Sequence, residues 1–246
     1  MERPNEVRVY NFIKKHHSTI YNPIDPSQLK LPPGYVVCIL GASRGIGEHI
    51  AYAYAAAGAR GIVLTSRTSS HDLVSAVAVK TRSLNPRATV KTAICDLTSS
   101  NSVAGVAHMI EVEFPRLDVV IVNGGFSGPI TLQVDEGEPA HFKACADVNY
   151  LGPYHAAHWL LPLLRRTEGG KTFIVVSALA ALITRGPIAN VGYCTSKIAQ
   201  IRLVEMISEQ YGKEGVLAVA VHPGAVKTKM AEAAPEEFMP CKLLAS

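Results

Sequence analysis

Residues 36–47 read VVCILGASRGIG, an apolar run followed at once by a glycine-rich turn. Residues 48–57 continue as EHIAYAYAAA, which favours a helix. Glycines in such a turn let the backbone bend sharply and approach a pyrophosphate, whose charge is stabilised by the free N–H groups and dipole of the helix N-terminus. A glycine-rich turn also occurs at plain strand-to-helix corners. Its meaning therefore depends on the segments that surround it.

The chain beyond this turn repeats an alternation of short β-branched runs and amphipathic segments. This pattern is typical of βαβ units around a buried parallel sheet. The predicted strands are Val36–Leu40, Gly61–Thr65, Thr89–Cys95, Asp118–Asn123, Lys171–Ser177 and Leu217–His222. The predicted helices cover about 45–57, 69–84, 99–113, 139–165 and 190–211. We therefore expect an α/β fold with a doubly wound parallel sheet of six or more strands and helices on both faces.

The length of 246 residues indicates one large domain, because a domain typically has about 100–200 residues. Residues 1–33 are polar and interrupted by prolines, so they are predicted to form an N-terminal arm. Residues 34–246 are predicted to form the single domain. After His222 the alternation ends, and no seventh strand is visible before Ser246. The C-terminal region is expected to be short or incomplete.

The composition excludes several classes of protein. Hydrophobic residues make up 48% of the chain and charged residues 18%, which excludes intrinsic disorder for most of it. The net charge of +4 comes from scattered basic residues, so no nucleic-acid partner is expected. The apolar stretches are shorter than the roughly 18 residues that span a bilayer. The charged N-terminus is unlike a signal peptide. The sequence predicts a cytoplasmic protein without membrane contact.

The cysteine and histidine patterns do not predict a metal site. The five cysteines lack CxxC spacing and are expected to be reduced. His155 and His158 lie one helical turn apart, but no cysteine or carboxylate partner has convincing spacing. We interpret both histidines as residues of helix packing and expect no metal.

The end of the second predicted strand bears on cofactor choice. A nucleotide fold that takes NAD usually has an acidic residue there to hold the ribose 2′-hydroxyl. Here the strand ends in Leu64-Thr65-Ser66-Arg67, without a carboxylate. The Arg67 guanidinium is suited to phosphate contact, and Arg44 in the glycine-rich turn adds a second positive charge. The two arginines favour NADP over NAD; the alternative is that both are solvated surface residues.

Tyr193 and Lys197 lie four residues apart in a predicted helix, a spacing that places both side chains on one face. A tyrosine with its ordinary pKa of about 10 exchanges protons poorly near neutrality, and a nearby ammonium lowers that pKa. The pair is therefore a candidate general acid–base unit. An exposed helical pair without function is the alternative.

Taken together, these features resemble the short-chain dehydrogenase/reductase family, of the classical type with a single Rossmann domain. Further matching residues carry the resemblance along the domain, namely Gly41–Gly47, Asp96-Leu97, Asn123-Gly124-Gly125, Asn149, Tyr193 with Lys197, and Pro223–Thr228. Their order and their positions on the predicted elements agree with the family. The arm and overall pattern most resemble fungal carbonyl reductases associated with secondary metabolism.

The resemblance implies a set of cofactor-binding residues, which comprises Gly41, Ser43, Arg44, Ile46, Gly47, Arg67, Asp96, Leu97, Asn123, Gly124, Tyr193, Lys197, Pro223, Val226 and Thr228. It implies that Asp96 accepts from the adenine amino group and that the turn 223–228 holds the nicotinamide carboxamide. It also implies that Lys197 contacts the nicotinamide ribose while Tyr193 protonates the substrate carbonyl oxygen. Asn149 would hold a water that links Lys197 to solvent.

Each of these assignments has a structural alternative. Asp96 could be a helix N-cap, Asn149 an internal polar residue, and Pro223-Gly224 an ordinary turn.

Two of the departures from the family pattern bear on function. The catalytic serine is commonly the second of two serines after the fifth strand, but here Ser177 is followed by Ala178. Either Ser177 takes the catalytic role or the hydroxyl is missing, which would cost about 10²-fold in rate. The second departure is the absent seventh strand, which in the family follows part of the substrate lid.

The leading hypothesis is an NADPH-dependent oxidoreductase that reduces a ketone or aldehyde of a small, fairly apolar substrate, or oxidises the alcohol. One alternative is a non-redox cyclase, dehydratase or isomerase on the same scaffold. Another is an NADP-binding sensor without turnover. The resemblance also implies a homodimer that pairs through the fourth and fifth helices.

Overall fold

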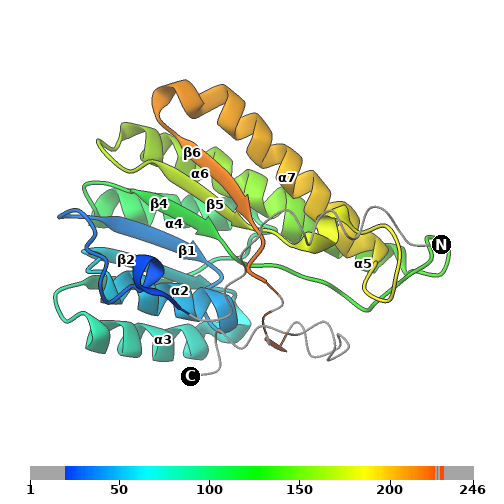
Figure 1. Ribbon diagram of the computed structural model, residues 1–246, viewed down its shortest axis with the longest axis horizontal. Helices are drawn as coiled ribbons and strands as arrows, with labels where there is room; N and C mark the ends of the chain where they lie inside the picture. Colours follow the sequence, from blue (N-terminus) through cyan, green and yellow to red (C-terminus); the bar gives the residue numbers. More distant parts are fainter. Residues whose placement is uncertain (1–19, 225, 227, 230–246) are drawn as a thin grey trace.

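The computed structural model describes residues 20–224, 226, 228 and 229. These residues contain one six-stranded sheet with the strand order β3-β2-β1-β4-β5-β6, and every neighbouring pair is parallel. The strands are β1 (Val36–Leu40), β2 (Gly61–Ser66), β3 (Thr89–Ile94), β4 (Val119–Val122), β5 (Thr172–Val176) and β6 (Leu217–Val221). The predicted doubly wound parallel sheet is confirmed (Figure 1).

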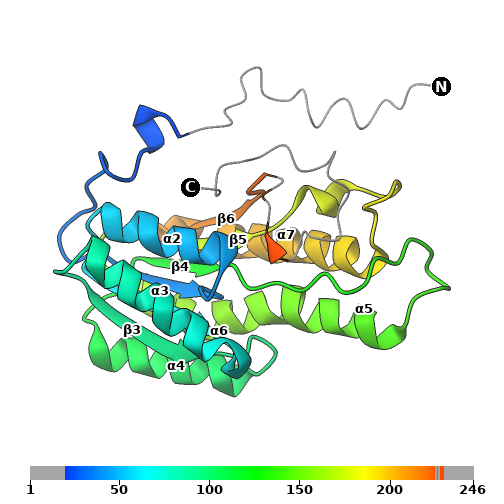
Figure 2. The ribbon, with the colours of Figure 1, turned by 90° about the horizontal axis from the view of Figure 1, so that it is seen from below.

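The helices agree with the predicted segments to within a few residues. They are α2 (Gly45–Ala56), α3 (His71–Leu84), α4 (Ser100–Glu113), α5 (Pro139–Ala146), α6 (Gly152–Arg166) and α7 (Val191–Tyr211). Short 3-10 helices are η1 (Asn22–Ile24), η2 (Thr68–Ser70), η4 (Leu179–Leu182) and η5 (Gly212–Glu214). The predicted helix 139–165 is one continuous rod in Figure 2, but a π-helical turn, η3 (Asp147–Leu151), separates α5 from α6.

Two hydrophobic cores cover the two faces of the sheet. Side chains of α4, α6 and α7 pack on one face, where Phe173 of β5 is fully buried. Side chains of α2 and α3 pack on the other face, against Ile39 of β1 and Ile62 of β2. All five residues of β1 are buried, as expected for a central strand covered on both sides. Burying one such aliphatic side chain contributes about 1.5–3 kcal/mol.

The strand order places a crevice at the carboxyl edge of the sheet. After β1 the chain continues to β2 on one side, and after β4 it continues to β5 on the other side. The loops that leave these two adjacent strands therefore diverge, and in open α/β sheets this switch point is where ligands bind.

The two ends of the chain are only partly described. Of the predicted arm, residues 1–19 lie outside the described residues, as do residues 230–246 of the predicted short lid region. The backbone N–H of Leu31 donates to the carbonyl oxygen of Ala57 at 3.0 Å. This bond attaches the described end of the arm to the C-terminus of α2.

Candidate active site

The sequence-predicted residues follow the carboxyl ends of all six strands. Because the strands are parallel, those ends lie at one edge of the sheet, and loops from segments far apart in sequence meet there. The glycine-rich turn follows β1, Arg67 follows β2, and Asp96 follows β3. Asn123 follows β4, Ser177 follows β5, and the segment 223–228 follows β6.

The glycine-rich turn has a backbone that requires glycine. Gly41 has a φ of +92° and Gly45 a φ of +60°, which belong to the left-handed region. A Cβ on Gly47 would overlap the Gly41 carbonyl oxygen and lie 2.6 Å from Asn123 Nδ2. The first turn of α2 therefore packs directly on the loop after β1, with its free N–H groups at the crevice.

The loop after β4 supports this turn. Asn123 Nδ2 donates to the Gly41 carbonyl oxygen at 2.6 Å, and the Gly124 N–H donates to the Leu40 carbonyl oxygen at 2.8 Å. A Cβ on Gly124 would lie 2.8 Å from Cδ1 of Leu97. The structure thus brings together Gly41, Gly47, Leu97, Asn123 and Gly124, while Ser43 and Ile46 lie half-buried in the same turn.

Two arginines lie at the ends of adjacent strands. Arg44 is the N-cap residue of α2, Arg67 directly follows β2, and both side chains are exposed. Among the described residues, neither guanidinium has a hydrogen bond or ion pair. The end of β1 is in register with Thr65 of β2. Two exposed guanidinium groups at this edge of the sheet are able to donate hydrogen bonds to a phosphate group beside the glycine-rich turn.

Asp96 is not the N-cap of α4, so that interpretation is wrong. The cap is Ser99, whose side chain accepts from the Ser102 N–H at 3.2 Å. Asp96 Oδ1 instead accepts from the N–H and the hydroxyl of Thr98, at 2.9 Å and 2.8 Å. This local turn fixes the carboxylate at the carboxyl end of β3.

Tyr193 and Lys197 lie in the first two turns of α7, as predicted. Lys197 Nζ is 5.5 Å from the centroid of the Tyr193 ring. The lysine is 3% exposed and donates to the Val176 carbonyl oxygen at 2.9 Å. Burial lowers the pKa of Lys197 to about 8 and raises the pKa of Tyr193 to about 12. The predicted lowering of the Tyr193 pKa by Lys197 is therefore not found, because burial is the largest effect on this phenol and it raises the pKa.

Asn149 lies in η3 and is fully buried. Its Oδ1 accepts from the Phe126 N–H at 2.9 Å, and its Nδ2 donates to the Phe126 carbonyl oxygen at 2.7 Å and to Ser196 Oγ at 2.9 Å. The side chain therefore ties the loop after β4 to α7. A π-helical turn is uncommon and often occurs at a functional site.

Ser177 is 6% exposed, and its Oγ has no hydrogen-bond partner among the described residues. Its backbone N–H donates to the Val221 carbonyl oxygen at 2.8 Å, which holds it at the end of β5 beside β6. A buried hydroxyl without a partner is costly. Such a group fits a site where a ligand supplies the missing partner.

The segment after β6 reaches the glycine-rich turn. A Cβ on Gly45 would lie 3.4 Å from Cγ2 of Thr228, and Val226 is 7% exposed. Pro223 precedes Gly224, which has a φ of +84°. Residues 225 and 227 lie outside the described residues.

Sequence reasoning missed Ser196 and Gln200. Ser196 Oγ accepts from Asn149 and donates to the Tyr193 carbonyl oxygen at 2.8 Å. Gln200 is fully buried and lies between Lys197 and the backbone of Asn149. The feature of the sequence that could have indicated Gln200 is its position three residues after Lys197, on the same side of the predicted helix.

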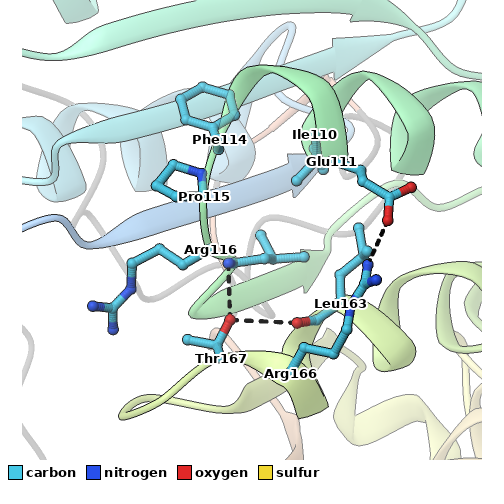
Figure 3. A pocket seen from close by; sticks show the side chains of 9 residues that line it. Ile110, Glu111, Phe114, Pro115, Arg116, Leu163, Arg166 and Thr167 are labelled. Carbon is cyan, nitrogen blue, oxygen red and sulfur yellow. Dashed lines mark hydrogen bonds and ion pairs between the residues drawn. The ribbon is translucent and has the colours of Figure 1, made fainter.

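Two cavities lie near the ends of the sheet. One of about 270 Å³ lies between residues 127–142, Cys145 and residues 190–192, next to Tyr193 in sequence. The other, of about 300 Å³, lies at the amino edge between α4, α6 and the segment before β4, and contains none of the predicted site residues (Figure 3). Its Arg166 pairs with Glu111 at 2.8 Å, which compensates that charge.

Within residues 20–224, 226, 228 and 229, no group of three His, Cys, Asp or Glu residues could hold a metal ion. None of the helices in this part of the chain is long and apolar enough to cross a membrane.

Comparison with protein families matches residues 35–238 to the short chain dehydrogenase family. The chain is 34% identical over 226 residues to the short chain dehydrogenase pgmD of Aspergillus terreus, covering 89% of this chain and 72% of that protein. It is 35% identical over 230 residues to the short chain dehydrogenase citE of Monascus ruber, covering 93% of this chain and 77% of that protein.

Solved structures show the same fold. The oxidoreductase yciK of Escherichia coli matches with a TM-score of 0.77 and 26% identity, over 89% of this chain and 85% of that chain. A short chain dehydrogenase from Shigella flexneri, complexed with NADP, matches with a TM-score of 0.75 and 26% identity, over 86% of this chain and 84% of that chain. From the family match over most of its length and from these relatives, this chain belongs to the short chain dehydrogenase family of oxidoreductases.

Proposed function

We propose that this protein is an NADPH-dependent reductase of a ketone or aldehyde on a small, fairly apolar substrate, or the corresponding alcohol dehydrogenase. The observation that carries the proposal is the buried Lys197 ammonium beside the Tyr193 ring, at the edge of the sheet where the glycine-rich turn lies. A buried cation next to a phenol is the arrangement that stabilises a phenolate.

The proposed roles follow from the positions of the side chains. NADPH, when bound, supplies the hydride. Tyr193 donates its phenolic proton to the carbonyl oxygen as the hydride adds to the carbon, so that the alcohol forms and a phenolate is left. Lys197 stabilises that phenolate, and the Ser177 hydroxyl donates a hydrogen bond to the carbonyl oxygen. Asn149 positions α7 through Ser196.

The cofactor preference rests on charge. Arg44 and Arg67 are exposed cations at the carboxyl ends of β1 and β2. A 2′-phosphate placed there would gain charge-assisted hydrogen bonds that the 2′-hydroxyl of NAD cannot provide. The similar short chain dehydrogenase from Shigella flexneri is complexed with NADP, which supports the same assignment. The Asp96 carboxylate is proposed to accept from the adenine amino group.

The proposed apolar substrate rests on the segment after Ser177. Residues of η4, Leu179–Leu182, carry only apolar side chains. This segment begins two residues after Ser177, the proposed oxyanion donor. An apolar substrate beside this segment would lose water from both surfaces on binding.

Homodimer formation is proposed through α6 and α7. Exposed large apolar side chains on these helices and on η3 are Tyr150, Leu151, Tyr154, Trp159, Ile198 and Met206. A second copy related by a two-fold axis would cover them. Light scattering of the purified protein measures the oligomeric state, and a monomer at micromolar concentration would contradict this part of the proposal.

The experiment for the main proposal mixes the protein with NADPH and a panel of ketones and aldehydes. A reductase lowers the NADPH absorbance and forms one alcohol for each NADPH oxidised. Conversion of substrate at constant absorbance would instead identify a non-redox enzyme on this scaffold. Binding of NADPH without conversion of any substrate would identify a sensor. Ala178, which occupies the usual position of the catalytic serine, is the feature that motivates the non-redox alternative.

A further inference from the structure

One buried side-chain amide connects the proposed acid–base pair to the π-helical turn. Gln200 lies on α7 one turn after Lys197 and is 0% exposed. Its Nε2 donates to the Asn149 carbonyl oxygen at 2.9 Å, and its Oε1 accepts from Lys197 Nζ at 3.3 Å. The amide therefore spans the gap between the ammonium and the backbone of η3.

The two neighbours of this amide allow only one orientation. The Asn149 carbonyl oxygen can only accept a hydrogen bond, and the Lys197 ammonium can only donate. A flipped amide would place two oxygens together and two groups of N–H donors together. The Gln200 oxygen is therefore held toward the ammonium.

This contact also fixes the direction of the ammonium. Lys197 has three N–H donors; Val176 accepts one through its carbonyl oxygen and Gln200 accepts a second. The third donor is left for the phenol or the cofactor. Without these contacts the long lysine side chain would sample several rotamers, and its ammonium would have no fixed direction.

We propose that Gln200 is a positioning residue of this enzyme, which keeps Lys197 protonated and aims it, while it couples the lysine to the turn that carries Asn149. The inference rests on the reductase function proposed above. A hydrocarbon side chain at this position would fill the space without performing either task.

The hydrogen bonds that stabilise the protonated form of Lys197 go to uncharged oxygens, those of Val176 and Gln200. Tyr193 and Cys194 are titratable neighbours on α7 itself, and burial raises the pKa of both. The titratable side chains on elements packed against α7 are Lys143 and Cys145 on α5, His141 on α5, Asp147 and Tyr150 on η3, Lys213 and Glu214 on η5, and His222 after β6.

None of these side chains supplies a negative charge to Lys197 within the described residues. Asp147 pairs with Lys143 at 2.5 Å, and Glu214 pairs with Arg165 at 2.6 Å. Burial is the cause that lowers the Lys197 pKa to about 8. Removing the Gln200 oxygen should lower that pKa further by about one unit, because one hydrogen bond to a charged group stabilises the charged form by about that amount.

The test compares three variants. Gln200→Met keeps the length of the side chain and removes both hydrogen bonds. Gln200→Glu places a carboxylate against the ammonium but cannot donate to the Asn149 carbonyl oxygen while ionised. Gln210→Met, on the exposed end of the same helix, is the matched control. The pH dependence of the reductase rate and an NMR titration of isotope-labelled lysine are measured on each.

The two substitutions at Gln200 should act in opposite directions. Gln200→Met should move the alkaline limb of the rate profile, and the Lys197 pKa read by NMR, to lower pH by about one unit. Gln200→Glu should move both to higher pH, because a carboxylate stabilises the ammonium. Gln210→Met should leave both unchanged. The Lys197 signal is identified by its loss in Lys197→Met.

A purely structural role gives a different result. In that case the rate falls by the same factor at every pH, and the Lys197 pKa does not move in either variant, which would overturn the inference. If the NMR pKa moves as expected but the wild-type protein reduces no carbonyl compound, the proposed function fails while the role of Gln200 in holding the charge stands. Should Gln200→Met not fold, Gln200→Ala, which also removes the amide oxygen, is measured in its place with the same expected direction.

Discussion

Lys197 Nζ donates a 2.9 Å hydrogen bond to the backbone carbonyl oxygen of Val176, the last residue of β5. This contact anchors a buried ammonium to the central sheet, where no carboxylate among the described residues pairs with it. Desolvation of an ammonium disfavours its charged form. The protein thus holds a destabilising charge at the position where the proposed reaction needs one.

Replacing that ammonium should stabilise the fold and abolish turnover. Lys197→Met removes a charge whose pKa burial lowers from 10.5 to about 8, which corresponds to about 3 kcal/mol. The lost hydrogen bonds offset part of this, so the free energy of unfolding at neutral pH should rise by about 1–2 kcal/mol. Denaturant unfolding at neutral pH measures the change, and reductase activity should be lost.

The pH dependence of this effect has a defined sign. Between pH 8 and 10.5 the unfolded wild-type chain binds more protons at Lys197 than the folded one, so the wild-type stability rises with pH. The advantage of Lys197→Met is therefore full below about pH 8 and shrinks above it. A variant that is less stable than wild type at neutral pH would show that the ammonium is stabilising in the fold.

Ser177→Ala should separate catalysis from stability. The Ser177 hydroxyl is buried without a partner among the described residues, so its removal should leave the free energy of unfolding unchanged or raise it by about 1 kcal/mol. If it donates to the substrate oxygen, kcat should fall about 10²-fold. Steady-state kinetics with NADPH measures this. Ser83→Ala, on the exposed face of α3, is the control, and an unchanged kcat in Ser177→Ala would assign the oxyanion donor elsewhere.

Gly47→Ala should damage the cofactor site. The new methyl group would overlap the Gly41 carbonyl oxygen and press on the Asn123 amide, so the turn after β1 must shift. We expect a loss of about 1–3 kcal/mol in stability and at least a tenfold rise in the Kd for NADPH. Fluorescence titration and thermal unfolding measure the two effects.

Gly105→Ala is the matched control for this substitution. Gly105 lies inside α4, and a Cβ there would meet nothing within 4 Å. Alanine has the higher helix propensity, so this variant should gain about 0.5–1 kcal/mol and bind NADPH as wild type does. Equal NADPH affinity in both variants would remove the glycine-rich turn from the cofactor site.

Arg67→Asp should change the cofactor preference. An aspartate at the end of β2 would repel a 2′-phosphate and accept from the 2′-hydroxyl of NAD. The ratio of kcat/KM for NADPH to that for NADH should fall at least tenfold. Arg87→Asp, in the exposed turn between α3 and β3, controls for the change in net charge. A ratio that stays constant would place the phosphate away from Arg67.

Most of the fold could be predicted because it depends on local patterns. The runs at 36–40 and 217–221 are short and consist of apolar residues. Residues typical of turns follow each run, and the structure has strands with these bounds. Parallel topology then brings the loops after all strands to one edge. The site could therefore be assembled from residues that lie far apart along the chain.

What the sequence could not show depends on tertiary contacts. The π-helical turn at Asn149 could not be recognised from hydrophobic periodicity, because the segments before and after it, α5 and α6, are both α-helical. Asp96 and Ser99 are both residue types that favour the N-cap position. The structure shows that α4 begins at Ser100, which makes Ser99 the N-cap. Gln200 reads as an ordinary helix residue until its two partners are located in space.

The central claim is that the Tyr193 phenol exchanges the proton at the substrate oxygen while its neighbours hold NADPH. The direct measurement is the NADPH affinity and the reduction rate of Tyr193→Phe, which removes one oxygen atom and keeps the ring. We predict a Kd for NADPH within about twofold of wild type and a kcat lowered by about 10³-fold or more. A variant that retains the full rate would contradict the account.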